Sequence, residues 1–93
     1  MLLMSAGTAA PLAVVRVGDL AYWLNDERQA VRCRVELVTA ERVYLRATTD
    51  EYGVTKGQVW YVSRYSRRVA PRSAVYIHKG RAHFDWKSVV VVG

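Results

Sequence analysis

The chain has 93 residues, which is enough for one domain and no more. Its hydrophobic content of 52%, with six tyrosines and three tryptophans, excludes a disordered chain. The single cysteine, Cys33, excludes an intrachain disulfide and a cysteine-based zinc site. Charge is distributed unevenly, because seven basic and no acidic residues lie between Glu51 and Asp85. That stretch accounts for the formal net charge of +6 and indicates an anionic partner, a polyanion such as DNA or RNA.

The first thirteen residues carry no charged side chain, and we interpret residues 1–13 as a flexible apolar tail before a single β-barrel-like domain at 14–93. No basic residue precedes the run Leu2-Leu3-Met4, which argues against a secretory signal. The stretch is also too short to cross a bilayer as a helix. We therefore expect no transmembrane segment and a cytoplasmic location. A tail that docks on a partner is the alternative.

No apolar pattern recurs at helical spacing over three turns, so the chain is expected to be mainly β. Residues 14–17 and 20–24 predict an opening strand that is kinked at Gly18-Asp19. Residues 31–37 and 42–48 alternate apolar and polar side chains around the loop Thr39-Ala40-Glu41. This alternation predicts a β-hairpin.

The register of this hairpin follows from the apolar faces. Pairing Val35 with Leu45 and Leu37 with Val43 keeps both apolar sets inside, whereas a shift by one residue would bury the arginines. The same register sets Arg34 opposite Arg46, and like charges repel at that position. Either solvent and Glu36 soften the repulsion, or an anion does. In the second case there is a secondary basic face, which consists of Arg32, Arg34 and Arg46.

Residues 58–63 predict a further strand, and Pro71 ends the strand pattern before it and begins a tight turn. Four consecutive valines at 89–92 predict a closing strand covered on both faces.

A second hairpin is predicted over residues 75–86, with Gly80-Arg81 as a type II′ turn. This turn would pair Ile77 with Phe84 and His78 with His83.

Three short motifs resemble those of SH3-like small β-barrels over residues 14–78. They are Gly18-Asp19 after Val15-Arg16-Val17, the paired aromatics Trp60-Tyr61, and the proline-containing turn in residues 70–76. The resemblance implies a small SH3-like barrel, or a strongly bent antiparallel sheet, with an added C-terminal hairpin. The acidic loop with which eukaryotic members read proline-rich peptides has little counterpart beyond Asp26-Glu27. The resemblance therefore leaves open a role like that of bacterial and phage members, which often act on nucleic acids or in protein assemblies.

Residues 60–68 interleave aromatic side chains with arginines. Arginine makes bidentate contacts with phosphate, and tyrosine offers a plane on which bases stack. The predicted nucleic-acid-binding residues are Lys56, Tyr61, Arg64, Tyr65, Arg67, Arg68 and Arg72. The alternative is that Trp60 belongs to the core and the arginines form a solvated loop.

Other chemistries have weaker signals. His78, His83 and Asp85 share one face of the second hairpin but would make a poor metal cage, so no metal site is predicted. Cys33 falls on the apolar face and is expected to be an inert core thiol. No nucleophile–base pair and no phosphate-binding glycine loop is recognisable, so we expect a protein that is not an enzyme and needs no cofactor.

The sequence therefore predicts a small basic module that binds nucleic acid with little sequence specificity. The alternative is a protein-interaction or assembly module, such as a phage or mobile-element accessory protein with an acidic protein partner. An exposed edge of the valine strand would also allow a homo-oligomer to form.

Overall fold

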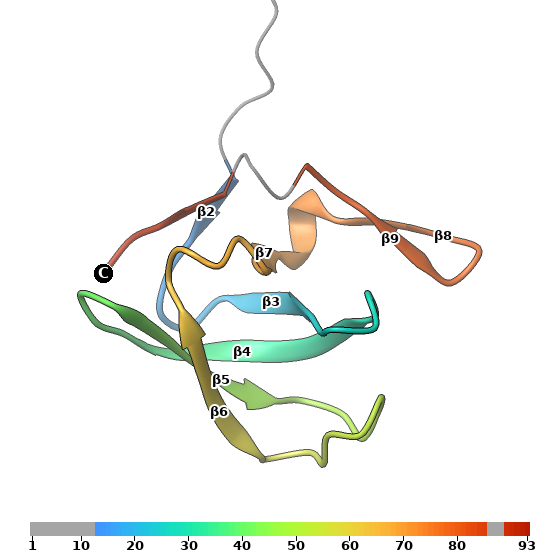
Figure 1. Cartoon of the computed structure of the whole chain (residues 1–93), viewed down its shortest axis with the longest axis horizontal. Coiled ribbons are helices and arrows are strands. Elements are labelled where there is room, and N and C mark those ends of the chain that lie inside the picture. The colour runs from blue at the N-terminus through green and yellow to red at the C-terminus, as the bar shows by residue number, and fades with distance from the viewer. Residues whose placement is uncertain (1–12, 86–88) are drawn as a thin grey trace, which may run out of the picture.

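The computed structural model describes residues 13–85 and 89–93 (Figure 1). In this part of the chain the only helical element is a short 3-10 helix, η1 (Arg72–Ala74), and the protein is mainly β. The strands are β2 (Ala13–Val15), β3 (Leu20–Leu24), β4 (Ala30–Val38), β5 (Arg42–Ala47), β6 (Val59–Ser63), β7 (Val69–Pro71), β8 (Tyr76–His78), β9 (Arg81–His83) and β10 (Val89–Val91). Residues 1–12 of the predicted tail lie outside the described residues, and Ala13 is the first residue of β2.

The central element is a five-stranded antiparallel sheet with the order β6-β5-β4-β3-β7. Strands β3 to β6 follow one another as a meander, and β7 then returns to the edge beside β3. The predicted antiparallel β fold is confirmed. Within the described residues β6 and β7 do not pair, so the sheet is open and not a closed barrel.

The predicted opening strand is divided into two strands that belong to different sheets. Gly18 adopts a φ of +90°, and the Asp19 carboxylate accepts a hydrogen bond of 2.9 Å from the N–H of Arg16. This turn separates β3 from β2, which pairs in parallel with β10. The closing valine strand is thus confirmed, but Val90 is exposed, so only one face of β10 is covered.

The core confirms the alternation predicted for the first hairpin. Val31, Cys33 and Val35 of β4 and Val43 and Leu45 of β5 are buried against one another or against neighbouring strands. Burial raises the pKa of the Cys33 thiol to about 12, although the charge of Arg72 lowers it slightly. The thiol is therefore protonated at neutral pH, as expected for a core cysteine.

The two tryptophans of the sheet close one side of this core. Trp23 of β3 and Trp60 of β6 both pack against the core cluster. Their ring centroids are 5.2 Å apart with an interplanar angle of 60°, the edge-to-face geometry that aromatic quadrupoles favour. The interpretation of Trp60 as a core residue is thus the one that the packing supports.

The register predicted for the first hairpin is correct up to Val35 and wrong beyond it. Arg34 lies opposite Arg46 and Val35 opposite Leu45, as predicted. A β-bulge at Glu36 then shifts the pairing, so that Leu37 faces Tyr44 and Val38 faces Val43. Leu37 is consequently 51% exposed, and Val38 packs on the core in its place.

The pairing predicted for the second hairpin is wrong by two residues. Ile77 lies opposite Ala82, and His78 lies opposite Arg81 and not His83. The turn consists of Lys79 and Gly80, with φ values of 51° and 75°. Two positive φ values define a type I′ turn, one of the two turn types whose twist matches that of the flanking strands. A shift of two residues leaves each side chain on its predicted face.

Candidate functional site

The predicted nucleic-acid-binding arginines differ in what their side chains contact. Arg64 is partly buried and donates hydrogen bonds of 2.7 Å to the backbone carbonyls of Thr39 and Val91. Its guanidinium thus ties the β4–β5 loop to β10. Arg67 lines the same small hollow against β10 as Arg64 does, but its side chain is exposed.

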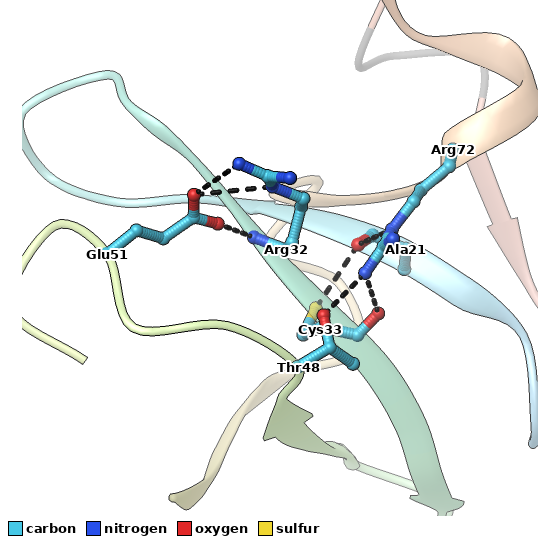
Figure 2. Close-up of polar contacts among 6 residues, drawn as sticks. All are labelled: Ala21, Arg32, Cys33, Thr48, Glu51 and Arg72. Atoms are coloured by element: carbon cyan, nitrogen blue, oxygen red, sulfur yellow. Dashed lines mark hydrogen bonds and ion pairs between the residues drawn. The ribbon is translucent and has the colours of Figure 1, made fainter. Parts of the chain in front are cut away.

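Arg72 is also engaged inside the fold (Figure 2). Its Nε donates to the carbonyl of Ala21 at 3.2 Å. Its Nη2 donates to the carbonyl of Cys33 at 3.3 Å and to Thr48 Oγ1 at 2.7 Å. These bonds hold η1 against β3, β4 and the end of β5. Three acceptors on one guanidinium leave little of it for a phosphate.

The other two predicted cations differ in their surroundings. Arg68 forms an ion pair with Asp26 in the β3–β4 loop. Lys56 is exposed, and its backbone N–H is fixed by Asp50 Oδ1 at 2.7 Å. Arg64, Arg68 and Arg72 thus have acceptors for their guanidinium groups within the described structure, whereas Lys56 and Arg67 are exposed.

The outer face of the central sheet does gather arginines and tyrosines. The side chains that alternate with the core along β4, β5 and β6 point away from it. The register places Tyr44 opposite Tyr61 and Arg34 opposite Arg46. We call this surface the arginine–tyrosine face, and its members are Arg32, Arg34, Arg42, Tyr44, Arg46 and Tyr61.

The arginine–tyrosine face carries an exposed stack beside the edge strand β6. The guanidinium carbon of Arg42 lies 4.1 Å from the centroid of the Tyr61 ring, within cation–π distance. The rings of Tyr44 and Tyr61 are 5.6 Å apart, and Arg42 Nη1 donates to Tyr44 Oη at 3.3 Å. The hydrogen bond with Tyr44 raises the pKa of Arg42 further above neutrality, so its charge is permanent.

An open hollow adjoins this stack. Arg42 and Tyr61 line it together with Glu41, Ser63 and Tyr65. Tyr65 is 73% exposed and its hydroxyl donates to the Ala40 carbonyl at 3.4 Å. The structure thus brings together the two predicted tyrosines, Tyr61 and Tyr65.

The secondary basic face predicted at Arg32, Arg34 and Arg46 is part of the same surface. Arg46 pairs with Glu36 at 3.0 Å, which softens the repulsion from Arg34 opposite. Arg34 donates to the carbonyl of Gly18 at 2.9 Å. Within the described residues, Arg34 and Arg42 make no ion pair with a carboxylate, so they are the cations of this face open to an anion.

Arg32 is held by Glu51, whose side chain is only 13% exposed (Figure 2). Glu51 Oε2 accepts the Arg32 backbone N–H at 2.6 Å, and Oε1 accepts from Nη2 at 3.1 Å. Burial works against ionisation of Glu51, but the hydrogen bonds from Arg32 outweigh it. The pKa of Glu51 therefore lies below its ordinary value of 4.5.

Sequence reasoning missed Arg42 and Tyr44 as site residues because both precede the basic stretch. Their outward orientation in β5 is readable from the alternation of Val43 and Leu45. Only the pairing of β5 with β6 sets them beside Tyr61.

Tyr76, His78 and His83 form an exposed aromatic cluster on one face of the β8–β9 hairpin, with centroid distances between 6.0 and 6.3 Å. Across residues 13–85 and 89–93, no three histidine, cysteine, aspartate or glutamate side chains come together to hold a metal ion.

Comparison of the chain with protein-family models, curated proteins and solved structures finds no match. Among the described residues, no helix has the length and apolar character needed to span a membrane.

Replacement of Arg72 by alanine is expected to lower the free energy of unfolding by about 2 kcal/mol, because charged hydrogen bonds to two carbonyls and a hydroxyl are lost. Arg72→Lys should restore only part of this loss, since an ammonium group cannot reach all three acceptors with a planar fork. Urea denaturation measures the free energy of unfolding of both variants. Arg67→Ala is the control and should change stability by less than about 0.5 kcal/mol. Equal stability of Arg72→Ala and Arg67→Ala would contradict the structural role of Arg72.

The ion pair of Glu51 predicts a pH-dependent contribution to stability. Since the folded-state pKa is lowered, the contribution is complete above the ordinary value of 4.5 and is lost as the pH falls through the folded-state pKa. The difference in unfolding free energy between the wild type and Glu51→Gln should therefore shrink in acid. Urea denaturation at neutral pH and at several acidic pH values measures it. A difference that is independent of pH would contradict this assignment.

Proposed function

We propose that this domain binds single-stranded nucleic acid through the arginine–tyrosine face, with little sequence specificity. The observation that carries the proposal is the exposed stack of Arg42 on Tyr61 beside Tyr44. Single-stranded nucleic acid requires cations for its backbone and flat π surfaces for its bases, and this stack offers both at one place.

The contacts of the face support a division of roles. Arg34 and Arg42 have no carboxylate partner among the described residues and would contact phosphates. A base can stack on the outer plane of the Arg42 guanidinium or on the exposed ring of Tyr65. Stacking accepts any base, which is the reason for low sequence specificity. Glu41 lines the same hollow and reduces its net charge. Because the phosphate contacts of this face release counterions, binding should weaken as the salt concentration rises.

We also propose that the fold is an open relative of the SH3-like barrels. The support is a meander of four strands whose fifth strand, β7, returns beside the first. The position of the proline turn differs from the SH3-like motif, in which this turn precedes the last strand of the barrel. The strand that pairs with β3 ends at Pro71, whereas β8, after the proline turn, belongs to a separate hairpin.

The first test of the proposed function is a titration of a fluorescein-labelled oligothymidylate by fluorescence anisotropy, at low and at moderate salt. Tyr65→Ala is expected to weaken binding by about 5- to 100-fold, the range for loss of one stacked base. Arg42→Ala should weaken binding as well and reduce the slope of log K against log salt by about 0.7, because one phosphate contact is lost.

Arg67→Ala is the matched control, since Arg67 is equally charged and exposed but lines the hollows beside β10 and not the one that Arg42 and Tyr61 line. It should change the affinity much less than Arg42→Ala. If the wild type fails to bind at low salt, the proposed function is wrong. If Arg67→Ala is as harmful as Arg42→Ala, binding does not use the arginine–tyrosine face.

A second candidate function, a protein-interaction module, is favoured by the free edge of β6. The carbonyl of Gln58 accepts a hydrogen bond from the N–H of Ala47, and the N–H of Arg64 donates to the carbonyl of Glu41. Because backbone groups alternate in direction along a strand, the odd-numbered residues between Gln58 and Arg64 direct their N–H and C=O groups away from β5. Val59 and Tyr61 therefore present unpaired backbone groups and exposed side chains at this edge. Such an edge accepts an added strand from a partner or from a second copy of the chain.

Val59→Pro tests this candidate, because the N–H that it removes does not pair with β5. If the edge mediates association, the wild type should form oligomers or retain a protein partner, and Val59→Pro should abolish this without unfolding the protein. Size-exclusion chromatography with light scattering measures the first outcome. A monomeric wild type that retains no partner would exclude this function.

A further inference from the structure

We propose that a single strand of nucleic acid also enters the groove between the β8–β9 hairpin and the end of the sheet where β3 joins β4. This inference rests on the proposed function and assigns it a second contact surface. The hairpin projects at the same end of the molecule as the β3–β4 loop (Figure 1). We call the space the hairpin groove, and the side chains that define it are Tyr22, Arg28, Tyr52, Ile77, Arg81 and His83.

One hollow of the hairpin groove has aromatic and aliphatic residues beside the ion pair of Arg32 and Glu51. Within the described residues, β8 and β9 pair only with each other, so no strand of the main sheet supports them. Ile77 lines one hollow with Tyr22 and Tyr52 and is still 45% exposed. An isolated hairpin that leaves an isoleucine uncovered gains little stability from packing. This hollow thus offers rings and an aliphatic side chain to a ligand.

The rim of the hairpin groove is cationic. A second hollow shares Tyr52 and Gly80 with the first and is lined by Arg28, Arg81 and His83. In the part of the chain that the structure describes, no side-chain hydrogen bond or ion pair occupies the guanidinium of Arg28 or Arg81. Two carboxylates line the two hollows. Glu51 is held by Arg32, which leaves Glu27 as the counter-charge. The rim therefore has an excess of positive charge.

The backbone at two turns of the rim is held in place before any ligand arrives. Arg28, Tyr52 and Lys79 occupy the tips of three turns around the groove, with φ values of 66°, 50° and 51°. This left-handed conformation is unfavourable for residues other than glycine, and such positions cluster at ligand-binding sites. At each tip, the strained position carries a long or aromatic side chain.

Hydrogen bonds fix two of these tips. Asn25 Oδ1 accepts the backbone N–H groups of Glu27 and Gln29, each at 2.9 Å, on either side of Arg28. Glu51 and Val54 exchange two backbone hydrogen bonds across Tyr52, at 3.1 and 2.9 Å. Pre-ordered groups lose less conformational entropy on binding.

The arrangement of rings inside and cations outside fits a single strand of nucleic acid. Bases can stack against Tyr52 and Tyr22 while phosphates contact Arg28 and Arg81. An acidic peptide would satisfy the rim but would not use the rings. The groove also connects with the arginine–tyrosine face, because Arg32 belongs to that face and lines the groove opposite Tyr22. One strand can therefore contact both surfaces.

The test uses the full chain and a fluorescein-labelled oligothymidylate. The double variant Arg28→Ala/Arg81→Ala should reduce the salt slope of binding by about 1.4, which corresponds to two lost phosphate contacts. The matched control Arg16→Ala/Arg67→Ala removes two exposed arginines that line neither hollow of the groove, and it should leave the slope nearly unchanged. Tyr52→Ala should weaken binding by about 5- to 100-fold, and Tyr52→Phe should retain it. Urea denaturation verifies that each variant is folded.

Photo-crosslinking with an oligonucleotide that carries 5-iodouracil separates the possible outcomes. Crosslinks to Tyr52 or Tyr22, located by mass spectrometry, support the hairpin groove. Crosslinks confined to Tyr44, Tyr61 or Tyr65, together with unchanged binding by Arg28→Ala/Arg81→Ala, overturn this inference and leave the proposed function intact. If the wild type binds no oligonucleotide, both are overturned. If a glutamate-rich peptide binds as tightly through Arg28 and Arg81, the occupant is a protein and not nucleic acid.

Discussion

The alternation of side chains along β4 is the constraint on which the rest of this structure depends. This strand is nine residues long and pairs with β3 on one side and β5 on the other. Because the side-chain period of a strand is two residues, burial of Val31, Cys33 and Val35 obliges Arg32 and Arg34 to face outward. The same core that stabilises the sheet thereby creates its basic outer surface.

Arginine has two different uses in this fold. Arg64 and Arg72 extend over the edges of a small open sheet and donate to backbone carbonyls far away in the chain. A guanidinium is suited to this because its five donors lie in a rigid plane and its alkyl stem packs on apolar surface. Arg42, by contrast, stacks on an exposed ring, where its charge remains accessible. A basic stretch in the sequence is therefore not equivalent to a basic surface.

The ion pair of Arg32 and Glu51 links the two surfaces to which we assign binding. It lies at the boundary between the arginine–tyrosine face and the hairpin groove, and it anchors the turn that carries Tyr52. Since Glu51 accepts hydrogen bonds from both the backbone and the side chain of Arg32, the charge of Arg32 is neutralised at this part of the surface. Among the described residues, the cations of these surfaces without a carboxylate partner are Arg28 and Arg81 in the groove and Arg34 and Arg42 on the face.

The sequence by itself determined the elements whose signals are local. The inward face of the first hairpin, the burial of Cys33 and the turn after Pro71 follow from periodicity and from the backbone limits of single residues. It could not locate the bulge at Glu36, because Leu37 and Val38 are both apolar and the alternation permits either of them inside. The parallel pairing of β2 with β10 and the contact of Tyr44 with Tyr61 were decided only by the tertiary structure.

The partners of the arginines were likewise decided by the tertiary structure. Arg72 bonds to a carbonyl 51 residues away and Arg64 to one 27 residues away. A long, flexible cation accepts whichever acceptor the folded backbone brings near, and nothing in its own neighbourhood of the sequence specifies which one. Local patterns fix the side of a strand to which a residue points, but the residues that it meets there depend on how distant strands pair.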